Sequence, residues 1–354
     1  MDPLNLDEFE MAAREALPRM TYDFIAGGAE DERSVDANRA AFARHMLRNR
    51  VLVDVTKRDT STRLLGMELP HPILLAPTAL HRVVHIDGEL ATARGAAAAN
   101  ALYTVSTATS TRLEDIAAAA PGGRRWFQLY HLGAREASEQ LIAQAIATGH
   151  EAIVLTVDVP LLGRRERDLR NAFTLPEGVA MAHAYEPAWA PPTDDVSRGW
   201  ASPIASASLT WDDLRWIRAA ASGRPLLLKG ILRGDDARRA LDLGVDGIWV
   251  SNHGGRQLDG AVATLDALTE IVAAVGGRCG VVVDGGIRRG TDVIKALALG
   301  ADAVAIGRPQ LYGLAVGGAS GVQRVVDLLR AELDLAMALV GAASIGALEP
   351  DLVA

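Results

Sequence analysis

Cysteine is almost absent from this sequence: Cys279 is the only one among 354 residues. An internal disulfide is therefore excluded, which favours a reducing compartment. No stretch reaches the roughly 18 uninterrupted apolar residues that a membrane-spanning helix needs. The N-terminus is acidic and amphipathic, and it lacks the basic and apolar regions of a signal peptide. These absences predict a cytoplasmic protein with no membrane partner.

Blocks of lysine or arginine are also missing, and the formal net charge is -8. A mild acidic excess of this kind argues against nucleic acid as a partner. No set of His, Cys and carboxylate residues has the spacing of metal ligands, so the sequence predicts no metal site. Hydrophobic residues make up 49% of the chain, which is enough for a large buried core.

Short apolar runs alternate with helical patterns along most of the chain. The runs occupy residues 72–77, 102–107, 125–130, 152–158, 225–230, 247–252, 280–286 and 303–308. Nearly continuous apolar strands that alternate with helices indicate a parallel sheet covered on both faces. A Rossmann fold would place G-x-G-x-x-G after the first strand, where this chain has PTALHRVVH. The predicted fold is therefore an α/β protein with a single (β/α)8, or TIM, barrel.

One domain is predicted over the whole chain, 1–354. Its segments are an N-terminal cap at one end of the barrel (1–71, with helices at 6–17 and after Gly28), the barrel itself (72–315) and C-terminal helices (316–354). Helix boundaries are predicted from two capping boxes and three terminal glycines. These residues are Thr111 with Glu114, Thr210 with Asp213, and Gly244, Gly276 and Gly300.

A long insertion, 161–209, separates the fourth and fifth predicted strands and is rich in Pro, Ala and Trp. Loops of this length in compact domains are usually functional or disordered. This one leaves the carboxyl end of a barrel strand, where the active sites of TIM barrels lie. We therefore expect residues 177–208 to form a mobile lid.

Polar side chains cluster at the carboxyl ends of the predicted strands, and all eight ends meet at one mouth of a barrel. They include Tyr130, Asp158, Lys229, His253 and Arg256. Single polar residues at strand ends serve ordinary hydrogen bonding. So many functional groups facing one mouth favour a catalytic site over a purely structural role.

The last two strands are followed by DGGIRRG (284–290) and AIGRP (305–309). Barrels commonly bind phosphate after their last two strands through backbone N–H groups. Gly285, Gly286 and Gly307 would let the backbone approach an anion, and Arg288 and Arg308 would supply charge. An isomerase or lyase that acts on a phosphorylated substrate could use this site and stays an alternative.

The segment SNHGGRQLDG (251–260) joins an imidazole, a guanidinium and three glycines directly after a strand. A carboxylate such as Asp158 can fix the tautomer of His253 and stabilise its imidazolium. Arg256 and Arg165 suit bidentate capture of a substrate carboxylate.

This segment resembles the signature of the FMN-dependent α-hydroxy acid oxidases and dehydrogenases. Other segments also resemble that family, in the family's order. They are YDFIAGGAEDE (22–32), PILLAPTA (72–79), WFQLY (126–130), LTVDVPLLGRRERD (155–168), LLLKGI (226–231), VVVDGGIRRGTDVIKALALGA (281–301) and IGRP (306–309). The resemblance covers residues 5–345.

The resemblance implies an FMN cofactor at the barrel mouth, with the positive charge of Lys229 near the flavin N1–C2 carbonyl. It implies that His253 is the catalytic base, supported by Asp158, that Tyr130 hydrogen-bonds the substrate, and that Arg256 and Arg165 hold its carboxylate. The remaining cofactor-binding residues that it implies are Pro77, Thr78, Ala79, Ser106, Gln128, Thr156, Ser251, Asp284, Gly285, Gly286, Arg288, Gly307 and Arg308.

Two positions depart from the glycolate-oxidase pattern. Phe24 stands where that group has a tyrosine, and Ala108 stands where it has a bulky tryptophan. A roomier and more apolar pocket favours an aromatic (S)-2-hydroxy acid of the mandelate type. Ala79 beside the flavin favours O2 as acceptor, which would give H2O2.

Three further expectations accompany this assignment. A dehydrogenase that uses another electron acceptor is the main alternative within the family. A non-catalytic flavin-binding protein is disfavoured, because the chain retains His253, Arg256, Lys229 and Tyr130. The expected assembly is a homotetramer.

Overall fold

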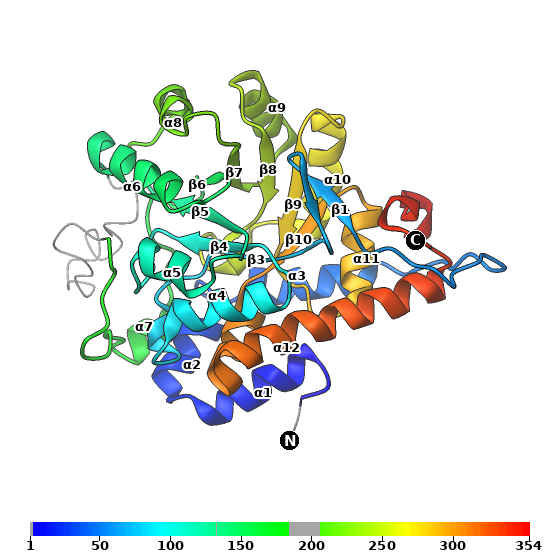
Figure 1. Ribbon diagram of the computed structural model, residues 1–354, viewed down its shortest axis with the longest axis horizontal. Coiled ribbons are helices and arrows are strands. Elements are labelled where there is room, and N and C mark those ends of the chain that lie inside the picture. Colours follow the sequence, from blue (N-terminus) through cyan, green and yellow to red (C-terminus); the bar gives the residue numbers. More distant parts are fainter. Residues whose placement is uncertain (1–2, 132, 184–205) are drawn as a thin grey trace.

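The computed structural model describes residues 3–131, 133–183 and 206–354. Parallel strands form a closed barrel in chain order, and the last strand pairs with the first (Figure 1). The barrel strands are β3 (Ile73–Leu75), β4 (Tyr103–Ser106), β5 (Arg125–Leu129), β6 (Ile153–Thr156), β7 (Leu226–Ile231), β8 (Gly247–Val250), β9 (Gly280–Asp284) and β10 (Ala303–Ile306). Seven of the eight lie within a predicted apolar run and β7 extends one residue beyond its run, so the predicted barrel is confirmed.

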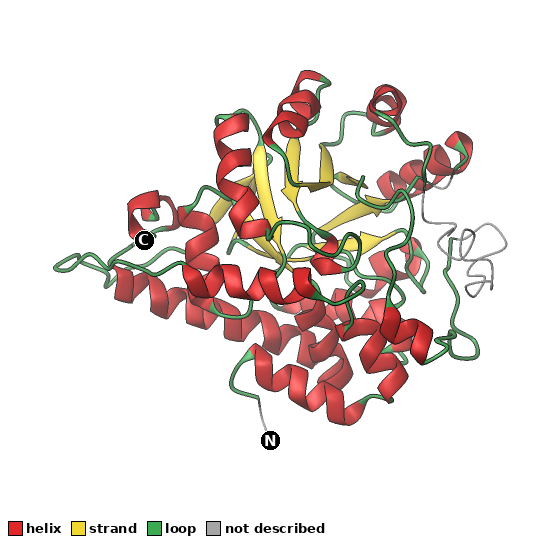
Figure 2. Cartoon of the chain, turned by 180° about the vertical axis from the view of Figure 1, so that it is seen from behind, coloured by secondary structure: helices red, strands yellow, loops and turns green. Residues whose placement is uncertain are grey.

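Helices surround the barrel as an outer layer (Figure 2). They are α4 (Gly88–Ala98), α5 (Leu113–Ala119), α6 (Arg135–Ala147), α8 (Leu214–Ala220), α9 (Gly234–Asp242), α10 (Thr264–Val275), α11 (Gly290–Ala298) and α12 (Arg308–Val340). One apolar cluster lies between helices and strands. A second, smaller cluster fills the barrel interior and includes the fully buried Trp126 and Trp249. The apolar strand runs thus contact a core on both faces.

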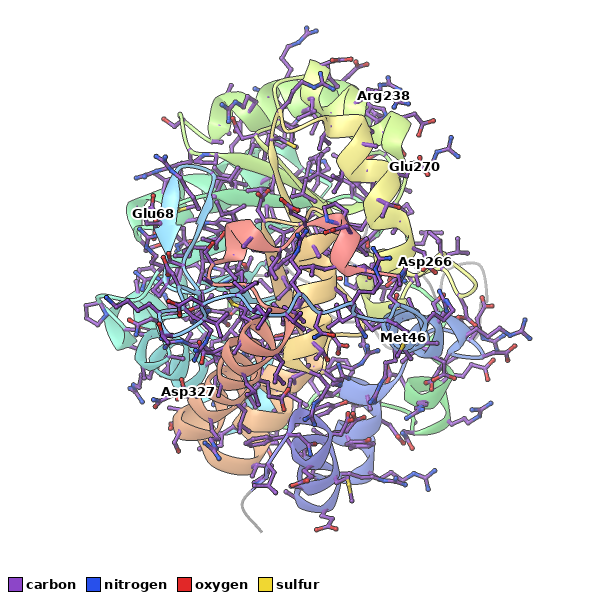
Figure 3. The ribbon with its side chains drawn as sticks, turned by 90° about the vertical axis from the view of Figure 1, so that its right-hand side faces the viewer. Met46, Glu68, Arg238, Asp266, Glu270 and Asp327 are labelled. Atoms are coloured by element: carbon purple, nitrogen blue, oxygen red, sulfur yellow. The ribbon has the colours of Figure 1, made fainter. Side chains whose placement is uncertain are left out.

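Polar contacts tie the outer helices together. Arg44, at the end of α3 (Arg33–Arg44), pairs with Asp266 of α10 at 2.5 Å. Figure 3 shows Asp266 and Glu270 on α10, with Arg238 of α9 nearby. Glu270 accepts a hydrogen bond of 2.7 Å from the Gly234 N–H, the first residue of α9. This carboxylate therefore satisfies a helix N-terminal N–H that has no partner within the helix itself.

The predicted helix boundaries are confirmed in four of five cases. Gly244, Gly276 and Gly300 follow their helices with φ of 82°, 57° and 101°. Thr210 and Asp213 form the expected capping box, on the 3-10 helix η2 (Trp211–Asp213). The Thr111 capping box is wrong, because the Thr111 hydroxyl donates to buried Glu89 at 2.8 Å and α5 begins without a side-chain cap.

The N-terminal segment is more elaborate than predicted. It contains α1 (Leu6–Ala16), α2 (Arg19–Ala26), α3 and a hairpin of β1 (Thr62–Leu64) with β2 (Met67–Leu69). Leu64 and Leu69 join the core inside the barrel, and Leu64 packs at Gly280, where β9 begins. Phe24 of α2 lines the cavity at the opposite end of the strands. The segment therefore reaches both ends of the barrel, with α2 at the cavity and the hairpin at the start of β9.

The long connection between β6 and β7 contains the short helix α7 (Glu166–Arg170). The predicted lid over 177–208 falls largely on 184–205, which lie outside the described residues. Helix α12 starts directly after β10 and is interrupted at Gly317 and Gly318, close to the predicted start of the C-terminal helices. Among the helices that the structure describes, none is long and apolar enough to cross a membrane.

Candidate active site

A cavity opens at the carboxyl ends of the strands, beside α2 and the start of α12. Its lining includes predicted site residues from both ends of the chain: Phe24, Pro77, Thr78, Ala79, Ser106, Ala108, Tyr130, Arg165, Lys229, His253, Arg256, Asp284, Gly285, Gly286, Arg288, Gly307 and Arg308. Four predicted residues are not part of this lining: Gln128, Thr156, Asp158 and Ser251. Hydrogen bonds connect three of those four to lining residues: Gln128 to Ser106, Asp158 to His253, and Ser251 to Lys229.

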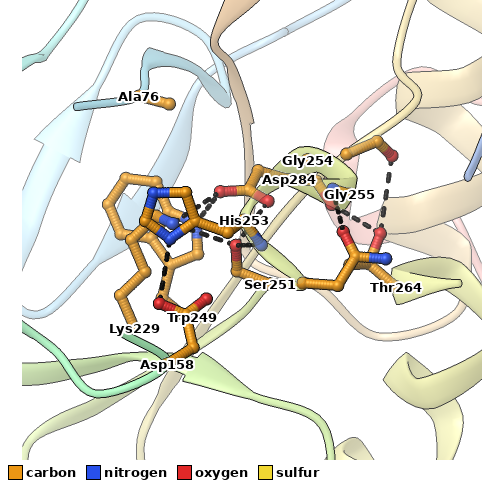
Figure 4. Close-up of polar contacts among 12 residues, drawn as sticks. Ala76, Asp158, Lys229, Trp249, Ser251, His253, Gly254, Gly255, Thr264 and Asp284 are labelled. Atoms are coloured by element: carbon orange, nitrogen blue, oxygen red, sulfur yellow. Dashed lines mark hydrogen bonds and ion pairs between the residues drawn. The ribbon is translucent and has the colours of Figure 1, made fainter. Parts of the chain in front are cut away.

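His253 lies at the start of the 3-10 helix η3 (His253–Gly255), just beyond β8. It has a φ of 59°, and it lines the cavity. The Nδ1 atom is 2.9 Å from Asp158 Oδ1, and Nε2 is 3.3 Å from the Tyr130 hydroxyl oxygen (Figure 4 shows the Asp158 contact). Because a carboxylate only accepts hydrogen bonds, Nδ1 carries the proton and Nε2 presents its lone pair toward Tyr130.

Burial sets the protonation of this group of residues. Burial lowers the pKa of His253, against the opposing effect of the Asp158 carboxylate. Burial acts to raise the pKa of Asp158, but His253 and Lys229 hold it below its usual value. Burial and Asp158 also raise the pKa of Tyr130, so its phenol stays a donor. A neutral imidazole beside a carboxylate, with Nε2 free of a proton, can act as a general base.

Asp158 can approach His253 because the neighbouring residue on β7 has no side chain. Gly230 has a φ of 107°, and a Cβ there would lie 2.6 Å from both Cβ and Cγ of Asp158. The sequence motif LLLKGI thus supplies Lys229 for the cavity and the space for the carboxylate behind His253.

Lys229 lies on β7 with its ammonium group inside the barrel mouth. Its Nζ is 3.0 Å from Ser251 Oγ and 3.5 Å from Asp284 Oδ2. Ser251 Oγ donates to Asp284 Oδ1 at 2.8 Å and accepts from the His253 N–H at 3.1 Å. Ser251 therefore connects the cationic side chain with the backbone that carries the base.

Three arginines bring positive charge into the cavity. Arg256 donates to the Phe24 and Gly27 carbonyls at 2.8 Å each, at the end of α2. Arg308 donates to the Ile25 and Gly27 carbonyls and to Gly254. Burial, reinforced by Arg165, lowers the pKa of Arg256 to about 9, and burial with Arg256 lowers that of Arg308 to about 10.

Arg165 is the arginine best placed to take an anion. Burial lowers the pKa of its guanidinium, and its buried Nε has no hydrogen-bond partner among the described residues. Buried guanidinium groups that repel one another are stabilised when an anion binds between them. Arg165 is therefore suited to its predicted partner, a carboxylate, whereas Arg256 already serves backbone carbonyls.

At the end of the cavity that was predicted to bind phosphate, the glycines and Arg288 contact the N-terminal helices. A Cβ at Gly286 would overlap the Asn38 carbonyl of α3, and one at Gly285 would lie 3.1 Å from Asn38 Nδ2. The close approach that these glycines permit is thus to α3. Arg288 lies 3.8 Å from carboxylate oxygens of Asp7 and Glu10, and its buried Nε has no hydrogen-bond partner among the described residues.

Sequence reasoning missed the amide pair that fixes the His253 loop. Asn38 and Asn252 donate to each other's side-chain oxygens at 2.8 Å, and both are buried. The Asn252 oxygen also accepts from the Gly255 N–H at 3.2 Å. The two residues are 214 positions apart, and no local pattern marks their pairing.

An apolar wall closes one side of the cavity. Phe24 stacks on Phe173 with ring centroids 4.3 Å apart and an interplanar angle of 2°. Buried Ala108 and Met181 line the cavity with Phe24. Met181 and Phe173 belong to the long connection after β6 and were not predicted as site residues. This wall offers apolar surface where a substrate side chain could pack.

The residues present fit an FMN. Besides the basic end of the cavity, buried donors near the strand ends lack hydrogen-bond partners among the described residues, namely Gln128 Nε2 and Thr156 Oγ1. An unpaired buried donor is costly, and ligand acceptors would remove that cost. The structure thus offers polar groups for a flavin ring and arginines for a phosphate.

Comparisons with known proteins identify the family of this chain. A family model for FMN-dependent dehydrogenases matches residues 13–354. An L-lactate oxidase of Nostoc sp. is 50% identical over 347 residues, which are 96% of this chain and 94% of the relative. A peroxisomal (S)-2-hydroxy-acid oxidase of Oryza sativa subsp. japonica is 47% identical, and the match covers 97% of this chain and 94% of the relative. A solved mandelate oxidase is 46% identical, with a TM-score of 0.91 over 99% of this chain and 98% of that one. The chain belongs to the family of FMN-dependent α-hydroxy acid oxidases and dehydrogenases.

Proposed function

We propose that the protein oxidises an aromatic (S)-2-hydroxy acid of the mandelate type to the 2-oxo acid, with O2 as acceptor and H2O2 as product. Membership of the family shows FMN-dependent oxidation of a 2-hydroxy acid and removes the flavin-free isomerase or lyase. The aromatic substrate and the acceptor are the new elements of the proposal.

The apolar wall carries the proposal of an aromatic substrate. Ala108 leaves space in the cavity, and Phe24 adds a ring without a hydroxyl. Burying a phenyl group contributes about 1.5–3 kcal/mol, whereas a methyl group contributes about 0.8. At 1.36 kcal/mol per factor of ten in rate, the difference favours mandelate-like acids by roughly threefold to fortyfold.

Overall similarity does not choose between substrates. The Nostoc lactate oxidase is 50% identical to this chain, and the mandelate oxidase is 46% identical. The proposal therefore depends on the pocket, where the residues that would contact the substrate side chain lie.

Each protein group has a distinct role in the proposed reaction. His253 Nε2 takes a proton from the substrate, and Asp158 stabilises the imidazolium that forms. Tyr130 hydrogen-bonds the substrate, and Arg165 with Arg256 neutralises its carboxylate. Proton removal at Nε2 fits hydride transfer, where the proton leaves the hydroxyl, and a carbanion route, where it leaves the α-carbon.

FMN, when bound, carries two electrons from the 2-hydroxy acid to the final acceptor. Its ring would lie against Pro77, Thr78 and Ala79, and its phosphate would lie toward Arg288 and Arg308. In total, the substrate loses two electrons and two protons, and O2 takes up both to give H2O2.

Oxygen as the acceptor is supported by Ala79 in the cavity lining and by the oxidase names of the relatives. A dehydrogenase reaction with another acceptor is the alternative. Peroxide release in air, with no dye added, distinguishes the two.

We also propose a cytoplasmic homotetramer. The single cysteine, Cys279, supports a reducing compartment. Exposed Val51 and Leu52, with Leu335 and Leu339 of α12, support association between copies. Light scattering of the purified protein measures the assembly directly.

The substitution Ala108→Trp tests the aromatic substrate. We expect the wild type to have a higher kcat/KM for mandelate than for lactate or glycolate, and Ala108→Trp to lose most of that preference by steric exclusion. Oxidation of lactate by the same variant is the internal control, because it reports an intact flavin and base. A wild type that prefers glycolate, or a variant that still prefers mandelate, contradicts the proposal.

A further inference from the structure

Two tryptophans of the inner barrel differ in whether their indole N–H has a hydrogen-bond acceptor. Trp126 of β5 and Trp249 of β8 are both fully buried in the same apolar cluster. Trp249 Nε1 donates to Asp284 Oδ2 at 3.0 Å (Figure 4), whereas Trp126 Nε1 has no partner among the described residues. The pair therefore compares an indole N–H that has an acceptor with one that has none among the described residues.

The oxygen that accepts from Trp249 also faces the ammonium of Lys229. Asp284 Oδ2 lies 3.5 Å from Lys229 Nζ, a separation longer than a direct charged hydrogen bond. Both residues are buried, with exposed fractions of 6% and 4%. Buried charges are weakly screened. The dipole of the Trp249 N–H, which points at the Asp284 carboxylate, therefore alters the electrostatic potential at Lys229.

We propose that Trp249 is a positioning residue that keeps the charge of Lys229 directed into the cavity. Its N–H offsets negative charge on Asp284 Oδ2 and competes with Lys229 for that oxygen. The ammonium then stays bonded to Ser251 and available to a negatively charged ring. With FMN bound, Trp249 raises the midpoint potential of the flavin.

The direction of the effect follows from electrostatics. Without the indole N–H, the partial positive charge next to Asp284 is lost, and the carboxylate can close on Lys229. Both changes make the potential in the cavity more negative. Reduction adds negative charge to the flavin, so the oxidised form becomes relatively more stable and the midpoint potential falls.

The matched substitutions Trp249→Phe and Trp126→Phe test this inference. Each substitution removes the same volume and keeps an aromatic ring at its position. At position 249 this matters because the centroid of the native Trp249 ring lies 5.9 Å from Lys229 Nζ. We expect Trp249→Phe to shift the equilibrium toward oxidised flavin about tenfold, which is ~30 mV for a two-electron couple. Dye-equilibrated anaerobic titration measures it. Trp126→Phe should stay close to the wild type, and equal shifts in the two variants overturn the inference.

An isosteric replacement covers the case in which Trp249→Phe fails to fold. A benzothienyl analogue of tryptophan, inserted at position 249, keeps the shape of the indole and replaces N–H by sulfur. We expect it to lower the midpoint potential as Trp249→Phe does. A potential equal to that of the wild type refutes the role of the N–H.

The inference rests on the proposed placement of Lys229 beside the flavin, and Lys229→Met separates the two failures. Loss of the ammonium should lower the midpoint potential and reduce the further effect of Trp249→Phe, because only the direct effect of the indole N–H on Asp284 then remains. An unchanged potential in Lys229→Met contradicts the placement of Lys229. A lowered potential there, with no effect of Trp249→Phe alone, contradicts only the role of Trp249.

Discussion

Replacing Asp158 by asparagine removes the charge behind the base and preserves its size. The amide oxygen of the introduced side chain could still accept from His253 Nδ1, which lies 2.9 Å from Asp158 Oδ1 in the structure. Hydrogen bonds to charged groups contribute about 1.5–3 kcal/mol, and neutral ones about 0.5–1.5. The variant should therefore lose about 1–1.5 kcal/mol of imidazolium stabilisation, which lowers the rate of flavin reduction roughly tenfold.

The pH dependence of Asp158→Asn gives a second signature. His253 must be neutral to act as a base, so the rate falls as the pH drops through its pKa. Burial already lowers that pKa, and Asp158 is the largest influence raising it. Without the carboxylate the pKa falls further, and the acid limb of the profile moves to lower pH.

Anaerobic stopped-flow absorbance measures the limiting rate of flavin reduction across the acid range. Asp158→Ala serves as a comparison, because it removes the acceptor as well as the charge and should be slower still. An unchanged rate in Asp158→Asn, or an acid limb displaced to higher pH, refutes the role of Asp158.

Other substitutions probe the same site. Gly230→Ala should displace Asp158 and slow flavin reduction. Gly223→Ala is the control, because Gly223 has a φ of 81° and no neighbour within 4 Å of an added Cβ, so this variant has only the strain of a side chain at positive φ. Equal rates of flavin reduction in the two variants refute the steric argument. His253→Ala should retain FMN and lose flavin reduction by about 10²–10⁴-fold or more, and a near-normal rate excludes it as the base. Arg165→Met should weaken substrate binding about tenfold or more at an unchanged flavin content, as titration of the flavin spectrum will show.

The barrel was predictable because its signals are local. Nearly continuous apolar runs marked every barrel strand, and glycines marked three helix ends. The β1–β2 hairpin was missed because each strand has three residues and no clear alternation. The capping box at Thr111 was predicted wrongly because the Thr111 hydroxyl donates instead to buried Glu89, 22 residues away in the sequence.

The location of the site was predictable from the topology, because parallel strands in a barrel bring their carboxyl ends together. Contacts that cross the chain were not predictable. Asn38 reaches Asn252 from an N-terminal helix, and Arg256 donates to carbonyls of α2. The indole N–H of Trp249 points at Asp284 only because β8 and β9 are neighbours in register. Such partners depend on three-dimensional placement, which residue spacing does not encode.

Anaerobic reduction of the bound flavin by a panel of acids, followed by readmission of air, tests the central claim most directly. We predict that (S)-mandelate bleaches the flavin at lower concentration and faster than lactate or glycolate. Air should then restore the yellow colour and release one H2O2 for each substrate oxidised. Flavin that no 2-hydroxy acid bleaches contradicts the proposed function, and bleaching fastest with glycolate contradicts the aromatic substrate.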